Sequence, residues 1–573
     1  LTVISDTIAN IEKSRHETVD IEKIPLTDEL TSKMLCEGKT GAVFQMESAG
    51  MTQLVRDLAP ENFADLIPLV ALYRPGPLGS GMVEDFIKGR HGEKEVTYMH
   101  PLLEPILKET FGVVLYQEQV MQIVQVLAGF TLGQADLLRR AMGKKKHEIL
   151  MAQKENFLVG CEKNHIEAGL ANTIFDLLTH FADYGFNKSH SAAYALVAWQ
   201  TAYLKAHYPA EFMAAMLTSI MDTPKVATYI ELCRRMGIKI LPPDINASSA
   251  YFSVDGVAIR FGLAAVRNVG ETAIENVARI REDGGPFSSL SDFCRRVDMR
   301  VVNRRVIESL IKCGAFDSFG AKRSQLLAIL PQTVMEAAQQ QKDAVSGQMG
   351  LFSDETIEET GMLQLPDIDE VPKAELLNWE KEATGFYITG HPLDQYASKL
   401  ENLPRIGSLQ PDAVRDKQVV RIGGMLTEAK RITTKKGDTM CFATVEDFTD
   451  SVEVTVFPRT FYQNMNLLVP DTPVVVQGRI DMTDESVKII ADSVWALKDY
   501  RFAYYIELPT GGLPETKREE MKQLIAAHHG AYATFFHSGG HWQKARENFW
   551  LDDAAETFQR LESIVGAGKV RKR

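Results

Sequence analysis

The segment from 418 to 492 constrains the fold most, because its apolar residues recur at every second position. Val452, Val454 and Val456 alternate with polar neighbours, which is the period of a β-strand with one buried face. Five short strands within about 75 residues predict a small barrel of the oligonucleotide-binding type. The expected strands are Val419–Met425, Met440–Glu446, Val452–Phe457, Val474–Ile480 and Val487–Ala491, with Lys435–Asp438 as the tip of the first hairpin.

Helical spacing dominates the first half of the chain. Val120, Ile123 and Val124 share one face of a predicted helix, and Pro209 precedes a second apolar stripe, as suits a helix start. We interpret these stripes as core. Residues 331–372, with Gln339–Gln341, are expected to form a linker, and the last 80 or so residues a small α+β domain. The predicted fold class is therefore multi-domain: mainly α, then a β-barrel, then α+β.

Composition excludes several classes of protein. The 573 residues suggest three to five domains, and the net charge of −13 argues against a wholly basic nucleic-acid coat. No apolar stretch is long enough to span a bilayer, and no secretion signal opens the chain, so we expect no membrane partner and a cytoplasmic location. Six scattered cysteines predict neither a zinc site nor a disulfide framework. Because the chain starts at Leu1 inside an apolar run, we expect that a segment precedes it.

The densest run of positive charge lies in 138–146. Its cations are Arg139, Arg140, Lys144, Lys145 and Lys146, and most of them fall near one helical face. Guanidinium groups bind phosphate oxygens in pairs, and ammonium groups act as point charges. The run therefore predicts a phosphate site, although a solvated helix end has the same composition.

A second candidate lies in 184–194. It combines aromatic rings with a polar set that could bind phosphate and sugar, namely Asn187, Lys188, Ser189 and His190. A polar turn that caps a helix explains the same residues equally well.

The segment from 259 to 325 carries 12 basic and 8 acidic residues, a local excess of four positive charges. We interpret the surrounding residues, about 255–330, as a helical module with two similar halves, in which the turn at 266–270 corresponds to the turn at 311–316. Glycine turns between helices can present backbone N–H groups to phosphate. The candidate DNA contacts are Arg267, Asn268, Gly270, Arg295, Arg296, Arg300, Arg304 and Arg305, with an ordinary charged hairpin as the alternative.

A short apolar pair lies within the predicted linker. Gln348, Met349, Leu351 and Phe352 have the pattern of a peptide that anchors in a hydrophobic pocket of a partner. The same pair could instead fold back onto a neighbouring domain. Elsewhere we find no phosphate-binding glycine loop, no zinc-protease motif and no set of nucleophile and base.

Several exact strings show that the chain resembles the C-family replicative polymerases, the bacterial DNA polymerase III alpha subunits, from Leu1 to the end. They are Phe44–Ser48, Arg74–Pro77, Tyr116–Met121, Leu138–Lys146, Gly185–Ser191, Ile240–Asn246 and Thr389–Pro392. The resemblance implies the end of the palm at 1–40, fingers at 41–254, tandem helix-hairpin-helix units at 255–330, a clamp-binding motif and linker at 331–415, an oligonucleotide-binding barrel at 416–497 and a clamp-loader-docking domain at 498–573.

The resemblance also implies residue roles. Arg139 and Arg140 would contact the triphosphate, with Lys144 and Lys145 nearby, and Ser189 and His190 would position the sugar. Gln348–Phe352 would bind the sliding clamp. The implied partners are primer-template DNA, deoxynucleoside triphosphates, the sliding clamp and the clamp-loader subunit, and a proofreading exonuclease subunit is left open.

By the order of the family's motifs, the metal-binding palm aspartates would lie before Leu1. The chain would then hold no ligand for the catalytic Mg²⁺ and would be inactive alone, although the parent protein is a DNA-directed DNA polymerase. If a metal site lay within these residues, Glu118, Asp136 and Asp183 would be the first candidates. The alternatives are a non-enzymatic scaffold that binds DNA and the clamp, and a helical repeat protein, for which no fixed period is found.

Overall fold

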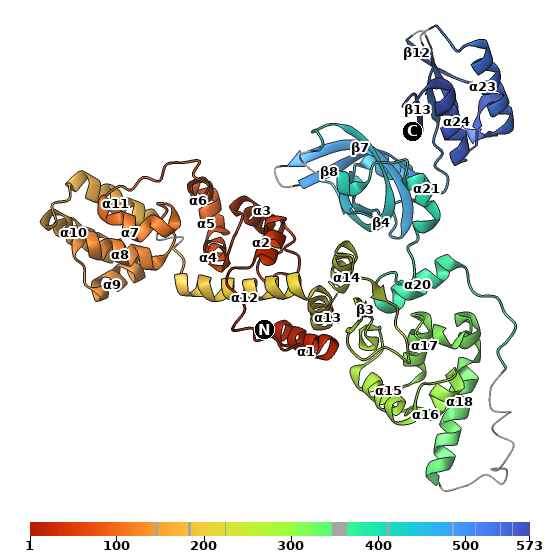
Figure 1. The fold of residues 1–573 in the computed structure, drawn as a ribbon, viewed down its shortest axis with the longest axis horizontal. Helices are drawn as coiled ribbons and strands as arrows, with labels where there is room; N and C mark the ends of the chain where they lie inside the picture. The colour runs from red at the N-terminus through yellow and green to blue at the C-terminus, as the bar shows by residue number, and fades with distance from the viewer. Residues whose placement is uncertain are drawn as a thin grey trace. The chain divides into compact units, whose positions relative to one another are not determined.

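This computed structural model describes residues 1–143, 147–181, 185–223, 225–346, 364–409, 413–483, 486–509, 511–538, 540–552 and 554–572. The chain forms two compact units, Leu1–Thr389 and Gly390–Arg573. The first is mainly helical and the second is mainly β (Figure 1). The spacing of apolar residues predicted this order, with a helical period in the first half of the chain and a period of two at 418–492. Among the described residues, no helix combines the length and the apolar character that a bilayer crossing requires.

In residues 1–235, leaving out 144–146, 182–184 and 224, the structure describes fourteen α-helices and two short 3₁₀ turns. The predicted helices at 120–127 and after Pro209 are confirmed as α8 and α13, and Pro209 occupies the first turn of α13. The elements are α1 (Thr2–Arg15), α2 (Glu29–Cys36), α3 (Ala49–Leu58), α4 (Phe63–Leu72), α5 (Pro75–Gly79), α6 (Met82–Arg90), η1 (Pro101–Leu103), α7 (Glu104–Leu107), η2 (Lys108–Thr110), α8 (Gln117–Ala128), α9 (Leu132–Gly143), α10 (His147–Lys163), α11 (Ala168–Phe181), α12 (Lys188–His207), α13 (Pro209–Ile220) and α14 (Val226–Arg235).

These helices enclose two separate cores. The first surrounds Phe157 and Phe175 and is formed by α7–α11, with Val120, Ile123 and Val124 pointing inward. The second surrounds α12. Its Trp199 is completely buried and donates its indole N–H to the Pro25 carbonyl at 2.9 Å. Since a buried indole needs a partner for its N–H, this bond fixes the chain between α1 and α2 onto α12.

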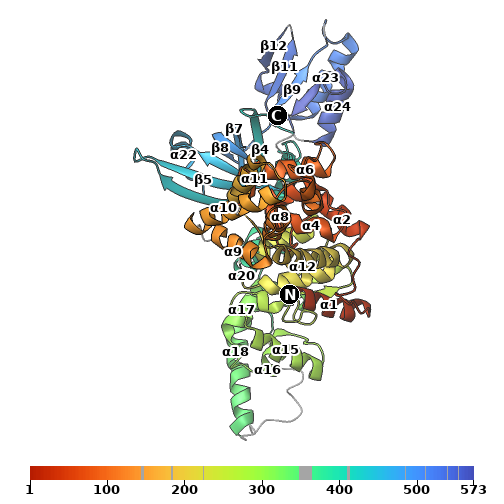
Figure 2. The same ribbon diagram turned by 90° about the vertical axis from the view of Figure 1, so that its left-hand side faces the viewer.

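A third core joins α1, α13 and α14 to a small sheet and a helical module. The sheet has the order β1-β3-β2, with β1 (Ile240–Leu241) parallel and β2 (Ser253–Asp255) antiparallel to β3 (Ala258–Arg260). Figures 1 and 2 both show α15–α18 packed as one group. Its elements are η3 (Leu263–Ala265), α15 (Glu271–Gly284), α16 (Leu290–Arg296), α17 (Arg304–Lys312), η4 (Asp317–Phe319), α18 (Arg323–Ser346) and α20 (Lys373–Thr384).

The linker predicted at 331–372 is wrong over residues 331–346. Helix α18 continues to Ser346 and includes Gln339–Gln341. Many of its residues are polar, so the sequence did not indicate a buried face. In the structure Leu326, Leu330 and Ala337 on this helix pack into the core. The predicted clamp motif, Gln348, Met349, Leu351 and Phe352, lies outside the described residues.

The predicted correspondence between the two halves of the module is also wrong. Gly270 precedes the first turn of α15, whereas Gly314 follows the last turn of α17 with a φ of 86°. The residue that corresponds to Gly270 is Asn303, which caps the start of α17. A glycine can mark either end of a helix, so the sequence alone did not distinguish the two.

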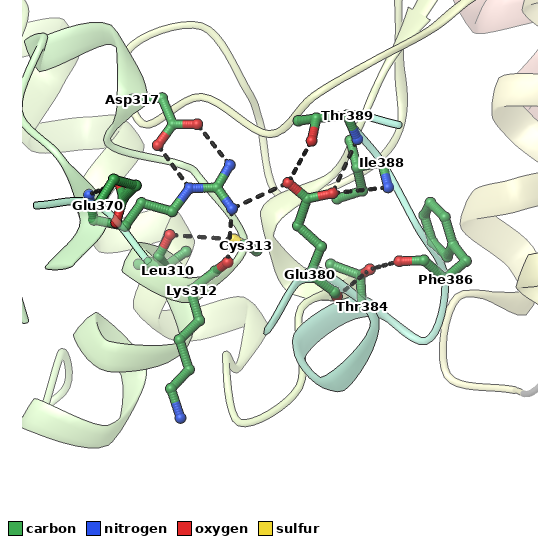
Figure 3. A network of polar contacts seen from close by, with 11 residues as sticks. Leu310, Lys312, Cys313, Asp317, Glu370, Glu380, Thr384, Phe386, Ile388 and Thr389 are labelled. Atoms are coloured by element: carbon green, nitrogen blue, oxygen red, sulfur yellow. Dashed lines mark hydrogen bonds and ion pairs between the residues drawn. The ribbon is translucent and has the colours of Figure 1, made fainter. Parts of the chain in front are cut away.

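A buried network fastens α20 to this module (Figure 3). The Arg323 guanidinium contacts Asp317 at 2.6 Å, Glu380 at 3.0 Å and the Lys312 carbonyl at 3.1 Å. The Glu380 carboxylate is completely buried and also accepts the backbone N–H groups of Ile388 and Thr389. We call this group of residues the Arg323 network. Because all of its members are paired, burial of the two charges is tolerated.

The second unit begins with three short turns and a closed barrel of order β4-β5-β6-β8-β7. All five predicted strands are confirmed, and the tip at Lys435–Asp438 joins the first two, with Gly437 at a φ of 88°. The elements are η5 (Asp394–Tyr396), α21 (Ala397–Leu400), η6 (Ile406–Ser408), β4 (Val419–Thr433), β5 (Thr439–Glu446), β6 (Ser451–Val456), α22 (Pro458–Asn464), β7 (Thr472–Thr483) and β8 (Ser486–Ala496).

The chain continues into a small α+β domain, as predicted. Its four-stranded sheet has the order β12-β11-β9-β13, with β9 and β11 parallel and the outer pairs antiparallel. The elements are β9 (Tyr504–Glu507), α23 (Glu515–Ala527), β10 (His529–Tyr532), β11 (Thr534–Ser538), β12 (His541–Lys544), η7 (Glu547–Phe549), α24 (Ala555–Val565) and β13 (Val570–Lys572). The exact residues at which we predicted the domains to begin and end stay predictions.

Candidate functional site

The first turn of α12 carries the polar residues predicted at 187–190. Asn187 is the N-cap, and its side-chain oxygen accepts the His190 backbone N–H at 2.8 Å. Its amide nitrogen donates to Glu118 Oε1 at 2.8 Å, and Glu118 Oε2 accepts the Lys188 N–H at 3.0 Å. A carboxylate from α8 therefore binds the positive end of a 20-residue helix, where anions are stabilised.

The Lys188 side chain turns toward a second carboxylate. Its ammonium contacts both oxygens of Glu109, at 2.7 and 2.8 Å, and lies 5.6 Å from the centre of the Tyr116 ring. Tyr116 is buried, and burial raises the pKa of its hydroxyl far above the ordinary value. A cavity of about 400 Å³ adjoins these residues and is otherwise lined mainly by apolar side chains of α3, α4 and α6.

Gln117 connects this turn to the arginines of α9. Its Oε1 accepts a hydrogen bond from Arg139 Nη1 at 3.0 Å, and its Nε2 donates to the Gly185 carbonyl at 2.9 Å. Its backbone N–H donates to the Phe186 carbonyl at 2.9 Å, next to the short parallel pairing of Tyr116 with Phe186. The two predicted phosphate sites therefore meet at the start of α8.

Both arginines share one carboxylate. Asp136 receives hydrogen bonds from Arg139 Nη2 at 2.8 Å and contacts Arg140 Nε at 2.7 Å. The hydrogen bond from Arg139, followed by the charges of both guanidinium groups, holds the pKa of Asp136 below its usual value. The Arg140 side chain is 66% exposed and that of Arg139 is 33% exposed, so an anion in solvent can reach both. Lys144 and Lys145 lie outside the described residues.

A row of rings extends from this turn along α12. The His190 ring lies 5.4 Å from that of Phe186 and 4.3 Å from that of Tyr194, which in turn lies 5.4 Å from Phe44. The Arg74 guanidinium stacks over Phe186 at 4.2 Å. Ser189 is exposed beside them. We did not predict a role for Phe44 or Tyr194, although the string Phe44–Ser48 was among those that carried the resemblance.

The helical module presents a second candidate surface. Gly270 has an open environment, where an added Cβ would contact nothing within 4 Å. At the equivalent position Asn303 caps α17, and its Oδ1 accepts the N–H groups of Arg305 at 3.0 Å and Val306 at 3.2 Å. Asn268 adopts a left-handed φ of 68° and donates to Ser309 Oγ at 3.2 Å, which joins the two hairpins.

Most of the predicted DNA contacts face solvent. Arg267, Arg295, Arg304 and Arg305 are exposed or partly exposed, and among the described residues neither Arg304 nor Arg305 takes part in an ion pair. The Arg300 side chain is 89% exposed and contacts Asp298 at 2.7 Å, and hydrogen bonds from Arg300 lower the pKa of Asp298 to about 2.

Arg296 differs from the other arginines. It donates to the carbonyls of Ile280 at 3.0 Å and Gly285 at 2.7 Å, and its guanidinium stacks on Phe287 at 4.4 Å. Because these donors are already used within the module, Arg296 holds the end of α15 and is poorly placed to bind a phosphate.

The barrel carries a third feature, which the sequence reasoning missed. Arg421 lies between two aromatic rings, 5.9 Å from the centre of Trp495 and 5.8 Å from that of Tyr500, and donates to the Tyr500 hydroxyl at 2.7 Å. It also contacts Gln477. No pattern in the sequence places these residues together, because they come from β4, β7, β8 and the chain after β8.

The carboxylates considered as alternative metal ligands are engaged otherwise. Glu118 binds the start of α12, and Asp136 binds the two arginines. Asp183 lies outside the described residues. Within the described ranges, no group of three or more His, Cys, Asp or Glu side chains is arranged to hold a metal ion.

Three family models match parts of the chain. The bacterial DNA polymerase III alpha subunit finger domain matches residues 1–165. A helix-hairpin-helix motif matches 237–326, and an OB-fold nucleic acid binding domain matches 420–497. The second and third matches agree with the module and the barrel of the structure.

Curated relatives match most of the chain. The DNA polymerase III subunit alpha of Pseudomonas aeruginosa is 44% identical over 529 residues, which cover 86% of this chain and 44% of the relative. The Escherichia coli K12 protein of the same name is 43% identical over 525 residues, with 88% and 45% covered. That of Thermus aquaticus is 40% identical over 547 residues, with 93% and 44% covered. The chain thus spans less than half the length of these relatives.

Proposed function

We propose that this chain, which belongs to the family of bacterial DNA polymerase III alpha subunits, takes part in the template-directed addition of deoxynucleotides to a primer 3′ end. The reaction is a nucleotidyl transfer, in which cations around the triphosphate neutralise the charge on its oxygens. In this proposal α8, α9 and α12 bind the incoming nucleotide, and the helical module and the barrel bind DNA.

The observation that carries the nucleotide-binding role is the bridge through Gln117. It brings Arg139 of α9 and the chain that leads into Asn187 of α12 to one place, although 48 residues separate them in the sequence. Arg139 and Arg140 would neutralise the triphosphate, and Ser189 and His190, at the exposed start of α12, would lie beside the sugar. Lys188, Lys144 and Lys145 would add point charges.

The test is a pair of alanine substitutions in the complete polymerase. Arg139→Ala with Arg140→Ala should raise the KM for deoxynucleotides and lower kcat, because charge-assisted contacts to phosphate are lost. The matched control is Lys163→Ala, which removes an exposed cation at the end of α10. Kinetics equal to the control would exclude the triphosphate role.

The catalytic metal would be Mg²⁺, which would activate the primer 3′ oxygen. Following the order of motifs in the family, we propose that its aspartate ligands belong to a part of the polymerase other than residues 1–573. Primer extension by this chain alone, on a primed template with Mg²⁺ and all four deoxynucleotides, should yield no product. Incorporation would show that the metal ligands lie within these residues.

A second candidate function is a non-enzymatic scaffold that binds DNA. The exposed arginines of the helical module, the match of 237–326 to a helix-hairpin-helix motif and the match of 420–497 to an OB-fold nucleic acid binding domain favour it. If the module binds the DNA backbone, the affinity of the chain for duplex DNA should fall steeply with salt. An affinity that does not depend on salt would argue against phosphate contacts.

The proposed protein partners rest on the resemblance. Gln348, Met349, Leu351 and Phe352 would bind the sliding clamp, and the C-terminal domain would dock on the clamp-loader subunit. Leu351→Ala with Phe352→Ala should remove clamp-dependent processivity and leave distributive synthesis intact. Loss of both activities would indicate misfolding instead.

A further inference from the structure

We propose that Gln117 and Glu118 are positioning residues that hold Arg139 and the first turn of α12 in one fixed arrangement. Neither residue is among those to which the sequence analysis gave a nucleotide-binding role. The inference rests on the proposed function, because it names the residues that organise that same site. It is carried by four side-chain hydrogen bonds and by the rigid turn from which they come.

The Gln117 amide can adopt only one orientation. Arg139 has donors alone, so the atom that faces it must be the amide oxygen, and the Gly185 carbonyl can only accept, so the atom that faces it must be the nitrogen. The two partners of this side chain lie 22 and 68 positions further along the sequence. A shift of either partner breaks one of the two bonds.

Glu118 is matched to its partners in the same way. Its carboxylate only accepts, and both atoms that face it are donors, Asn187 Nδ2 and the Lys188 backbone N–H. Since Asn187 uses its oxygen to cap His190, its nitrogen is left for Glu118. Glu118 therefore fixes both the orientation of the cap and the place of the helix start.

The following residue, Gln119, makes the start of α8 rigid. It is 2% exposed, and its oxygen accepts the N–H groups of Leu115 and Tyr116 at 2.8 and 2.9 Å. Its nitrogen donates to Thr110 Oγ1 at 2.8 Å and to the Ile106 carbonyl at 3.2 Å. Because these buried contacts hold the turn, Gln117 and Glu118 can transmit a fixed geometry to their partners.

The arrangement has a consequence for the arginine. Without Gln117, the only hydrogen bonds of the Arg139 guanidinium within the described part of the chain are those to Asp136, which lies on the same helix. It would then lose its connection to α12, and the two halves of the site would be positioned independently. Binding of a ligand that must contact both halves would weaken, while the fold would be preserved.

The test uses the complete polymerase and a double-mutant cycle with dATP as the varied nucleotide. Gln117→Met removes both hydrogen bonds with little change in shape, and it should raise the KM for dATP about tenfold. In the Arg139→Ala background, Gln117→Met should raise the KM for dATP no further, since the guanidinium that Gln117 positions is absent. Glu118→Gln should also raise the KM about tenfold. The affinity for primer-template DNA and the thermal unfolding midpoint should stay unchanged.

The control and the contradicting outcomes keep the two proposals apart. Gln122→Met makes the same change at an exposed position of the same helix and should have no effect. If Arg139→Ala leaves the KM unchanged, the proposed function fails. If Arg139→Ala raises the KM but Gln117→Met does not, or if the two effects add, the positioning role is wrong and the proposed function stands.

Discussion

Two groups of paired charges in the helical unit differ in how much of them water reaches. In the α8–α12 site, defined by Gln117, Glu118, Asp136, Arg139 and Lys188, the Arg139 and Asp136 side chains are 33% and 31% exposed. In the Arg323 network, the Arg323 and Glu380 side chains are 6% and 0% exposed. In both cases the pair consists of a guanidinium and a carboxylate.

The difference in exposure distinguishes charged pairs that a ligand can open from charged pairs that hold the fold. A pair in contact with water has little net stability, so a ligand with stronger charge can displace the carboxylate from the cation. A buried pair cannot be opened without leaving a charge in a medium of low dielectric constant. Exposure therefore assigns exchangeable cations to the α8–α12 site and fixed ones to the Arg323 network.

The largest expected effect is in the Arg323 network. Glu380→Ala leaves the buried Arg323 charge and the N–H groups of Ile388 and Thr389 without their acceptor, and should cost about 3–5 kcal/mol. The buried Cys313 thiol lies beside this network and reports its opening. Thiol labelling in urea, with the site located by mass spectrometry, measures the effect.

The matched control for this change is Glu382→Ala on the same helix. The Glu382 side chain is 67% exposed and lies 3.9 Å from the Lys312 ammonium, so its loss should leave the labelling of Cys313 unchanged. Equal labelling of the Glu380 and Glu382 variants would show that burial does not distinguish the two classes of pair.

The second effect tests a buried cation that is held by carbonyls. Lys205 donates to the carbonyls of Lys39 at 2.7 Å and Gly41 at 2.6 Å, and burial lowers its pKa to about 8. Between pH 8 and the ordinary value of 10.5, the unfolded state binds more protons than the folded state. The free energy of unfolding should therefore rise with pH in this window, by about 3 kcal/mol in total.

The measurement compares wild type with Lys205→Met at pH 7.5, 9 and 10, by pulsed hydrogen exchange of α12 peptides in urea. Only the wild type carries this contribution, so its stability relative to the variant should increase with pH. Lys33→Met, which changes an exposed lysine of α2, is the control. A constant difference across this range would mean that Lys205 is not desolvated.

The third effect compares the two hairpins of the helical module. Asn303→Ala removes the cap of α17 and should cost about 1 kcal/mol. Gly270→Ala should leave stability unchanged, because its φ is −83° and an added Cβ meets nothing within 4 Å. If Gly270 is present for close approach to a phosphate, the alanine should nevertheless weaken duplex binding, about tenfold.

Urea unfolding and a fluorescence titration with labelled duplex DNA measure these two quantities. Normal DNA affinity of the Gly270→Ala chain would remove the phosphate role of this turn. A large loss of stability would instead show a packing requirement for glycine that the structure does not contain.

The smallest effect belongs to the exposed pair. Asp136→Asn releases Arg139 and Arg140 from their shared carboxylate and should leave the thermal unfolding midpoint within experimental error. Calorimetry at low and high salt measures this midpoint. A decrease of several degrees would place Asp136 among the structural pairs and weaken the comparison.

The strands and several helices could be predicted because their periods are local. The barrel strands were found, but β4 extends to Thr433 and thus beyond the predicted end at Met425. The hydrophobic pattern stops there, whereas backbone pairing with β5 continues through polar residues. The helix over residues 331–346 was not predicted, because its many glutamines are typical of a linker. In the structure one of them, Gln341, donates a hydrogen bond to the Val297 carbonyl at 2.7 Å.

The candidate site was predicted in parts. The charge of Arg139 and Arg140 and the composition of Asn187–His190 indicated these residues as binding candidates. Gln117 was part of a string shared with the family, but no role was predicted for it. The hydrogen bonds that unite them join residues distant in sequence, which periodicity does not encode. The DNA contact at Arg296 stays a prediction, and charge alone does not reveal that its donors bind carbonyls of α15 and the turn after it.

The sequence by itself determined the order of the domains, the period of the barrel and the family to which the chain belongs, since these depend on local pattern and on matching strings. The tertiary structure alone decided which charges hold the fold and which can meet a ligand. Arg139 and Arg323 are the same residue type, each paired with a carboxylate. Only the packing around them sets the access of water, and with it the energy needed to exchange one anion for another.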